Sequence, residues 1–588
     1  MPRASNPCTL KPISPMTLRI VQGQQAQETI TNPGFQSQWA QLHEACPWAT
    51  AFQSPGYITT WHEAYKEMYS PLVVSEVSAA GDLIGLLSLA TENGSGRVIV
   101  AGGHQAEYKA WLALPANGGS FIEAALKLSA RKMNISVLSF GYLPPGTPTD
   151  WTKGASGPSL ISDLTLHPRP IIPLNVEAEV AGYLQKKKSG KSTRNSWNRL
   201  KRIGNLRLER LREAAQLAPI FDELIAYYDT RQGGTHGKFA FETDSAKKPF
   251  HLALLRLPDL LHVTLLKAGE EIISASFGLS YRKTYSWAMP MFSPFCGADS
   301  PTKVHLLMLV EQLHQDGYAV FDLTAGADPF KDRFAASYDS VHSLSIYFKR
   351  GKWIRHKVTH QGEALARRAL RSFRIAPNSA VEHVKQVARV PLGNWPTVLV
   401  QRSLALLRRS LSKPKLRIYV LESKNVPAID DSPSTPRDRL ADLLPFQPSE
   451  FWRTRQAFLA ESLKNIESGH HFYTRVEKGR LLHLTWLVEN PKMKTFPETD
   501  QAFQFPPGSA VVYGAYTDPA SRRCGLGQFA LRQILQDVAR NPTLNYVFTV
   551  VAADNKPARQ LIEKFGFTYL EENPNFGTAQ ARQPLPPS

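Results

Sequence analysis

RRCGLG, residues 522–527, leads from a strand-like apolar segment, Ala510–Tyr516, into a segment of helical periodicity, Gly525–Ala539. Its two glycines let the backbone approach a ligand closely. The helix that begins here presents unpaired N–H groups and the positive end of its dipole, which favours a bound pyrophosphate. Arg522 and Arg523 add charge-assisted contacts. By itself this loop fits a structural turn equally well.

The sequence after the loop favours the ligand-binding interpretation. A strand, Tyr546–Ala552, is followed by Asn555 and by a helix that ends at Gly566-Phe567. This order resembles the GNAT acetyltransferase superfamily. The resemblance implies a mixed-sheet α/β domain with acetyl-CoA as acyl donor, and Asn555 beside the pantetheine arm. It assigns the coenzyme pyrophosphate to Arg522, Arg523, Cys524, Gly525, Leu526 and Gly527.

The segment departs from the GNAT pattern at its acid and base positions. Many members carry a tyrosine general acid in the last helix, where this chain has Ile562. The strand Ala510–Tyr516 also lacks a carboxylate general base. A base must reach the substrate proton directly or through one water. The nearest candidates are Asp518, Tyr513 and Tyr516, and the alternative for Asp518 is a turn residue before Pro519.

A second resemblance covers residues 18–348. The stretch Phe52-Gln53-Ser54-Pro55-Gly56-Tyr57 with Trp61 is similar to the opening of the CelD/BcsL acetyltransferases linked to cellulose biosynthesis. Later stretches agree, among them Tyr227–Arg231, Ser300–Lys303 and Phe321–Lys331. Members of this family are similar to FemABX transferases, with two GNAT-like halves in tandem. The resemblance implies Arg231, His251 and Lys331 as substrate-side residues, although each is more often an ordinary surface or core residue.

The second of these halves has its own candidate phosphate site. Asp299–Thr302 leads into a helix that starts near Lys303, which places Ser300, Thr302 and Lys303 at a helix N-terminus. No paired glycines are present, so this site is less specific than residues 522–527.

Composition changes divide the chain into successive parts. We expect an α/β (α+β) protein of three GNAT-like units, with one basic helix over Lys186–Arg212. The interval Lys349–Arg417 holds 17 lysine and arginine residues against only Glu363 and Glu382. It reads as a helical linker, with docking on an anionic membrane surface as the alternative. The expected parts are a loose tail at 1–17, GNAT-like halves at 18–168 and 169–348, the linker at 349–415, a GNAT domain at 416–572 and a loose tail at 573–588.

The 588-residue chain has a formal net charge of +19, which favours an anionic partner such as a coenzyme. Four scattered cysteines argue against a disulfide framework or structural zinc. His470 and His471 alternate across a strand and therefore share no face for a metal. No apolar run approaches the ~20 residues of a membrane span. We expect a cytoplasmic protein without a metal. The basic linker adds the alternative that the protein contacts the inner face of the membrane peripherally.

The preferred interpretation is an acyl-CoA-dependent N- or O-acyltransferase whose acceptor belongs to an exopolysaccharide such as cellulose, or to its synthesis machinery. Two alternatives stay open. A FemABX-like transferase would use aminoacyl-tRNA, and its basic segments would bind the RNA. A non-catalytic scaffold would sense acyl-CoA through degenerate GNAT folds.

Overall fold

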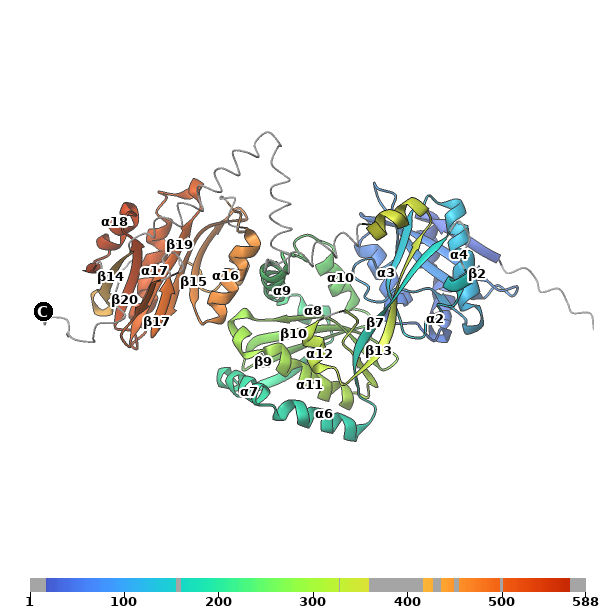
Figure 1. Ribbon diagram of the computed structural model, residues 1–588, viewed down its shortest axis with the longest axis horizontal. Helices are drawn as coiled ribbons and strands as arrows, with labels where there is room; N and C mark the ends of the chain where they lie inside the picture. The colour runs from blue at the N-terminus through green and yellow to red at the C-terminus, as the bar shows by residue number, and fades with distance from the viewer. Residues whose placement is uncertain are drawn as a thin grey trace, which may run out of the picture. The chain divides into compact units, whose positions relative to one another are not determined.

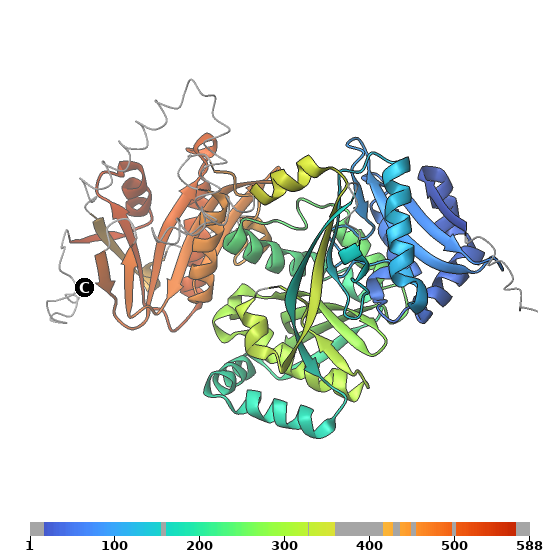
Figure 2. The same cartoon turned by 45° about the vertical axis from the view of Figure 1, so that its right-hand side comes forward.

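The computed structural model describes residues 17–154, 160–326, 328–358, 416–426, 435–448, 454–496 and 501–571. The expected C-terminal tail, nearly all of the expected N-terminal tail and the linker from residue 359 to 415 lie outside these residues. The described residues divide into two compact units, one drawn mainly from the chain before residue 369 and the other mainly from the chain after it. Figure 1 colours the chain from blue to red, and Figure 2 turns the same view.

The first unit begins with a five-stranded antiparallel sheet. Its strands β2 and β3 form an antiparallel hairpin and are buried along most of their length. Gly85 on β3 is required there, since a Cβ would lie 2.5 Å from the Phe121 ring. The strands are β1 (Thr17–Gln22), β2 (Tyr69–Val77), β3 (Leu83–Glu92), β4 (Val98–Val100) and β5 (Leu112–Ala113), and the helices of this part are α1 (Gly23–Thr31), α2 (Pro33–Ala45), α3 (Pro55–Ala64), α4 (Gly118–Lys132) and α5 (Trp151–Gly154).

An eight-stranded mixed sheet forms the rest of the first unit. Its order is β6-β13-β7-β12-β11-β10-β9-β8. The long strands β7 and β13 pair along their length and run side by side in both views. The boundary expected at 168/169 falls inside β7, so both expected halves contribute to this sheet. The strands are β6 (Val137–Leu143), β7 (Ile161–Pro173), β8 (Leu206–Leu211), β9 (Leu261–Ala268), β10 (Glu271–Tyr281), β11 (Thr284–Phe292), β12 (Val320–Asp322) and β13 (Ser337–Tyr347).

The single basic helix expected over Lys186–Arg212 is wrong. The chain forms α6 (Glu177–Ser189), α7 (Lys191–Ile203) and then strand β8. Gly190 separates the two helices, and Gly204 ends the second. A Cβ on Gly204 would lie 2.4 Å from the backbone nitrogen of Gly269, so the close approach of β8 to the β9–β10 turn needs glycine. The remaining helices of the first unit are α8 (Ala214–Leu217), α10 (Lys247–Leu254), α11 (Pro301–Gln315) and α12 (Pro329–Phe334). Most of α9 (Phe221–His236) belongs to the second unit.

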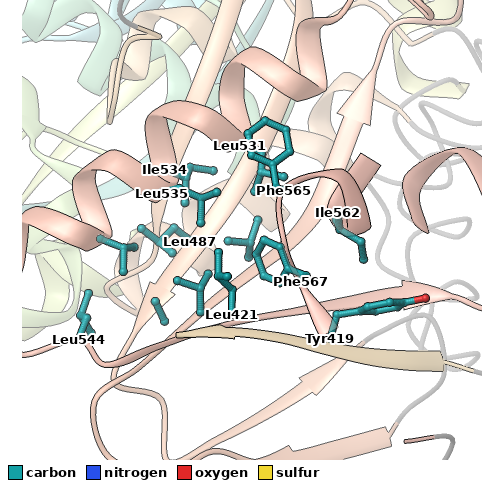
Figure 3. Packing of buried hydrophobic residues seen from close by; sticks show 14 of the residues in the cluster. Tyr419, Leu421, Leu487, Leu531, Ile534, Leu535, Leu544, Ile562, Phe565 and Phe567 are labelled. Atoms are coloured by element: carbon teal, nitrogen blue, oxygen red, sulfur yellow. The ribbon is translucent and has the colours of Figure 1, made fainter. Parts of the chain in front are cut away.

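The second unit contains a six-stranded sheet of order β15-β16-β19-β20-β14-β21. Figure 3 shows Leu531, Ile534 and Leu535 of its long helix gathered with Phe565 and Phe567. This packing buries the apolar face that the sequence periodicity predicts. The strands are β14 (Leu416–Glu422), β15 (His471–Glu477), β16 (Arg480–Glu489), β19 (Ser509–Thr517), β20 (Tyr546–Ala552) and β21 (Thr568–Glu571), with a separate hairpin of β17 (Met493–Phe496) and β18 (Gln501–Gln504). The helices are α16 (Arg455–Glu467), α17 (Leu526–Arg540) and α18 (Lys556–Lys564).

The expected α/β class with mixed sheets is confirmed. Among the described helices, none combines the length and the apolar composition that crossing a membrane requires.

Candidate active site

A cavity opens in the second unit where two parallel strands separate. β19 and β20 pair only from Ser509–Val512 against Tyr546–Thr549. Beyond that point β19 keeps its pairing with β16, and β20 keeps its pairing with β14. The gap between them is a cavity of about 290 Å³ whose wall includes Leu531 of α17 and Leu561 of α18. It is large enough for an extended ligand chain rather than for a few waters.

A β-bulge interrupts β19 at the edge of this cavity. Leu484 pairs with Tyr516 and Trp486 with Tyr513, so Gly514 and Ala515 together face one residue of β16. Gly514 has φ of 61°, in the left-handed region that favours glycine. Both bulge residues line the cavity. Because a bulge takes a residue out of the hydrogen-bonded ladder, this is the point on β19 where we expect a backbone N–H to face a ligand carbonyl.

The loop of residues 522–527 ends at the same cavity. Gly525 is the N-cap of α17 with φ of 76° and makes no side-chain cap, and Arg523 has φ of 68°. The side chains of Arg522, Arg523 and Cys524 are exposed. Gly527 lines the cavity. The uncapped N-terminus of α17 therefore lies at the cavity, and two exposed arginines directly precede it in the chain.

Asn555 and Ile562 reach the cavity from α18. The Asn555 Oδ1 accepts a hydrogen bond from the Ala558 backbone N–H at 3.2 Å and caps the helix. This bond fixes the direction of the Asn555 amide. Ile562 is buried, and its hydrocarbon side chain cannot act as a general acid.

The catalytic candidates of the sequence fall in different surroundings. Tyr513 lines the cavity. Tyr516 packs edge-on against Phe446, with ring centroids 5.4 Å apart. Asp518 is 1% exposed, and its carboxylate accepts a hydrogen bond from Arg480 Nη2 at 2.7 Å. The cavity wall includes neither Tyr516 nor Asp518 among the described residues.

His483 lines the cavity from β16 and was not predicted from the sequence. Its Nδ1 lies 2.9 Å from Thr517 Oγ1 and its Nε2 lies 2.7 Å from Thr485 Oγ1. Burial lowers the pKa of His483 to about 4, so the ring is neutral near pH 7. Because His483 and Thr485 are two residues apart in an expected strand, they share one face of it, and this spacing could have indicated a polar site.

The first unit contains a second pair of diverging parallel strands. β11 and β12 pair only over Thr284–Ser286 and Val320–Asp322. The helix α11 follows β11, and its N-cap Ser300 has φ of 52°. Lys303 Nζ donates to Ser192 Oγ at 2.9 Å, and burial, then the charge of Arg333, lowers the pKa of Lys303. Thr302 is 9% exposed, and its hydroxyl has no hydrogen-bond partner among the described residues.

The three substrate-side candidates of the resemblance over residues 18–348 lie on three helices. Arg231 is on α9, His251 on α10 and Lys331 on α12. His251 is buried, its Nδ1 lies 2.7 Å from the Lys247 carbonyl oxygen, and burial lowers its pKa to about 4. Lys331 Nζ donates to Thr324 Oγ1 at 2.8 Å, and burial lowers its pKa against the opposing charge of Glu107.

No group of three or more His, Cys, Asp or Glu side chains is arranged to hold a metal ion in the described parts of the chain.

Two segments match known families. Residues 187–332 match a family described as an acetyltransferase (GNAT) domain, and residues 437–567 match the acetyltransferase (GNAT) family. The chain therefore carries two GNAT acetyltransferase domains, one in each of these segments. Neither match names the CelD/BcsL family, so that resemblance stays a prediction. Among curated proteins, no sequence matches the chain.

Solved structures are similar at low identity. FemX is 11% identical, and the similarity covers 54% of this chain and 97% of FemX at a TM-score of 0.40. The C-terminal domain of a putative lysylphosphatidylglycerol synthetase from Agrobacterium fabrum is 12% identical, covering 55% of this chain and 94% of that domain at a TM-score of 0.35. A putative GNAT-family acetyltransferase from Novosphingobium aromaticivorans is 21% identical, covering 26% of this chain and 60% of its own at a TM-score of 0.19.

Proposed function

We propose that the second unit transfers an acyl group from acyl-CoA, with acetyl-CoA as the donor to test first, to an amine or hydroxyl acceptor. The observation that carries this proposal is the cavity between β19 and β20, which has the 522–527 loop at one end and the Gly514–Ala515 bulge beside it. The loop would hold the pyrophosphate, and Asn555 would lie along the pantetheine arm.

The transfer is direct. The acceptor attacks the thioester carbonyl, and a backbone N–H of the bulge polarises the carbonyl oxygen as it gains charge. The C–S bond then breaks and the CoA thiolate leaves. Holding both reactants in one cavity lowers the entropic part of the barrier.

Calorimetry with acetyl-CoA tests the donor. The variant Gly525→Glu/Gly527→Glu fills the loop and adds two negative charges, and we expect it to abolish a micromolar binding isotherm. The matched control is Gly182→Glu/Gly351→Glu, because a Cβ at either position meets no atom within 4 Å. It changes the net charge equally and should bind like the wild type.

The other outcomes each decide a point. If binding survives the loop variant, a Lys303→Glu variant tests the N-terminus of α11 as the coenzyme site instead. If the wild type binds no acetyl-CoA, the proposal is wrong.

The acceptor is proposed on the resemblance of residues 18–348 to CelD/BcsL proteins, as a hydroxyl or amine of an exopolysaccharide such as cellulose or of its synthesis machinery. Mass spectrometry of glucan oligosaccharides incubated with acetyl-CoA and the protein tests this choice, with a net gain of about 42 Da expected for each acetyl group that replaces a hydrogen. Unmodified oligosaccharides together with an acetylated amine would redirect the search to small amines.

A second candidate function is aminoacyl transfer from charged tRNA, and the surface of α6 and α7 favours it. The helix α7 contains no acidic residue. Its basic side chains are exposed at Lys191, Arg194, Arg199, Lys201 and Arg202. Binding of tRNA that weakens steeply with salt, together with failure to bind acetyl-CoA, would favour this function over the first.

A further inference from the structure

Tyr513 has a histidine partner behind the cavity. The Tyr513 hydroxyl lies 2.5 Å from His470 Nδ1, and the two rings meet edge-on at a centroid distance of 5.6 Å. Tyr513 itself lines the cavity and directly precedes the Gly514–Ala515 bulge. A short hydrogen bond thus connects the cavity wall to a nitrogen base that lies outside the cavity lining.

The charges around this pair favour a neutral imidazole. Burial, followed by the charges of Lys494 and His471, lowers the pKa of His470 to about 4. Lys494 belongs to β17, and its Nζ lies 3.6 Å from the centroid of the Tyr513 ring. His471 has its own partner, since its Nδ1 lies 2.6 Å from Asp438 Oδ2. A neutral His470 with its proton on Nε2 accepts from the Tyr513 hydroxyl, and Lys494 stabilises negative charge on the phenol oxygen.

Few other groups could take the acceptor's proton. Among the described residues of the cavity wall, the side chains that titrate are Tyr513 and His483. Both nitrogens of His483 are engaged by threonine hydroxyls. The carboxylate of Asp518 is paired with Arg480 away from the wall. Tyr513 is therefore the group that both lines the cavity and is hydrogen-bonded to a nitrogen base, His470.

We propose that Tyr513 and His470 form the proton relay of the acyl transfer, a step that rests on the function proposed above. As the acceptor attacks, its N–H or O–H proton passes to the Tyr513 oxygen, and the Tyr513 proton passes to His470 Nδ1. The new bond joins the acceptor to the acyl carbon, and the C–S bond breaks. The imidazolium then returns its proton through Tyr513 to the CoA thiolate, which restores neutral His470 and releases CoA–SH. Tyr513 is the catalytic residue, and His470 acts through it as a positioning residue and proton store.

Three variants test the relay in the full-length protein. Tyr513→Phe should lower kcat by about a hundredfold or more, the usual effect of losing a general base. His470→Gln should lower kcat by about tenfold or more, because a glutamine amide can accept a hydrogen bond from the phenol but cannot take up its proton. The calorimetric Kd for acetyl-CoA should stay within about twofold for both, since the relay acts in the transition state and not in donor binding. The control His471→Gln alters the neighbouring ring, which contacts Asp438 instead, and should keep kcat.

The pH profile separates a relay from a structural contact. His470 must be neutral to accept a proton, so kcat falls on the acid side as pH drops through the pKa of His470. Lys494→Met removes a charge that lowers this pKa and should move the acid limb of kcat upward by about half a unit or more. A merely structural role for His470 would leave the position of that limb unchanged.

The outcomes distinguish the two proposals. If the wild type is active and Tyr513→Phe or His470→Gln has the same kcat, the relay is wrong and the proposed acyl transfer is unaffected. Acetyl-CoA binding without turnover on any amine or hydroxyl acceptor would overturn both.

Discussion

His262 offers a sharp test of how the first unit responds to acid. It lies on β9 with no exposed surface, and neither ring nitrogen has a hydrogen-bond partner among the described residues. Its ring meets those of Tyr285 and Tyr318 edge-on at centroid distances of 5.2 and 6.1 Å. Burial, then the charges of Arg210 and Arg212, lowers the pKa of His262 to about 3. We predict that His262→Phe makes this unit more resistant to acid.

The sign and size follow from proton binding in the two states. In the unfolded chain His262 takes up a proton as pH falls through its ordinary pKa of 6.5, whereas in the folded unit it stays neutral until about pH 3. The unfolded state binds more protons in that window, so the free energy of unfolding decreases as pH falls. At pH 5 the difference amounts to about 2 kcal/mol, from about 1.4 kcal/mol for each pH unit. His262→Phe removes this loss and keeps an aromatic ring between the tyrosines.

Urea unfolding followed by tryptophan fluorescence measures the effect, since Trp39, Trp61 and Trp111 are buried in the first unit. The variant and the wild type should have similar unfolding free energies at pH 7.5, and at pH 5 the variant should be more stable by about 2 kcal/mol. Other buried histidines contribute equally to both proteins and cancel. His236→Phe changes an exposed histidine and should follow the wild type. Equal pH dependence in His262→Phe and the wild type would refute the reasoning.

Three further predictions concern other contacts. Arg480→Met leaves the buried carboxylate of Asp518 without its ion pair and should lower the free energy of unfolding in urea by about 2 kcal/mol. Adding Asp518→Asn to the same chain should restore most of this loss. A double variant no more stable than Arg480→Met would contradict this. Gly204→Ala should lower the melting temperature because its Cβ would lie 2.4 Å from a backbone nitrogen, whereas Gly182→Ala, in open space within α6, should raise stability by about 0.5–1 kcal/mol. Alkylation of the exposed Cys524 should weaken acetyl-CoA binding by about tenfold or more, because the added group lies in the proposed pyrophosphate loop. Acetyl-CoA should in turn slow the alkylation of Cys524, measured by mass spectrometry. An alkylation rate unchanged by acetyl-CoA would place the coenzyme away from residues 522–527.

Local patterns predicted the elements around the cavity well. The strand expected at Tyr546–Ala552 is β20 with the same bounds, and the helix expected at Gly525–Ala539 differs from α17 by one residue at each end. The helix expected between Asn555 and Gly566-Phe567 is α18. These elements have strong apolar periodicity and glycine or asparagine at their starts. The prediction of one basic helix over Lys186–Arg212 was wrong because it relied on the continuous run of basic residues. Gly190 and Gly204 interrupt that run and mark the ends of the two helices.

The polar surroundings of the cavity depend on contacts between distant strands. His470 and Tyr513 are 43 residues apart and meet because β15 and β19 both pair with β16. From the sequence, His470 was considered with His471 as a metal-binding pair and rejected, and no local pattern could bring it to Tyr513. The β17–β18 hairpin, which carries Lys494, was also missed, since its strands have four residues each.

The place of β14 in the sheet has a consequence for how the second unit forms. β14 is the first strand of that sheet in the chain, yet it lies between β20 and β21, its last two strands. On the ribosome, residues 416–422 emerge early and remain without strand partners until more than a hundred later residues have been made. Such long-range pairing slows folding and leaves an apolar strand exposed in the meantime. A fragment that starts at residue 437, where the family match begins, would omit β14 and leave β20 and β21 with an unfilled place between them.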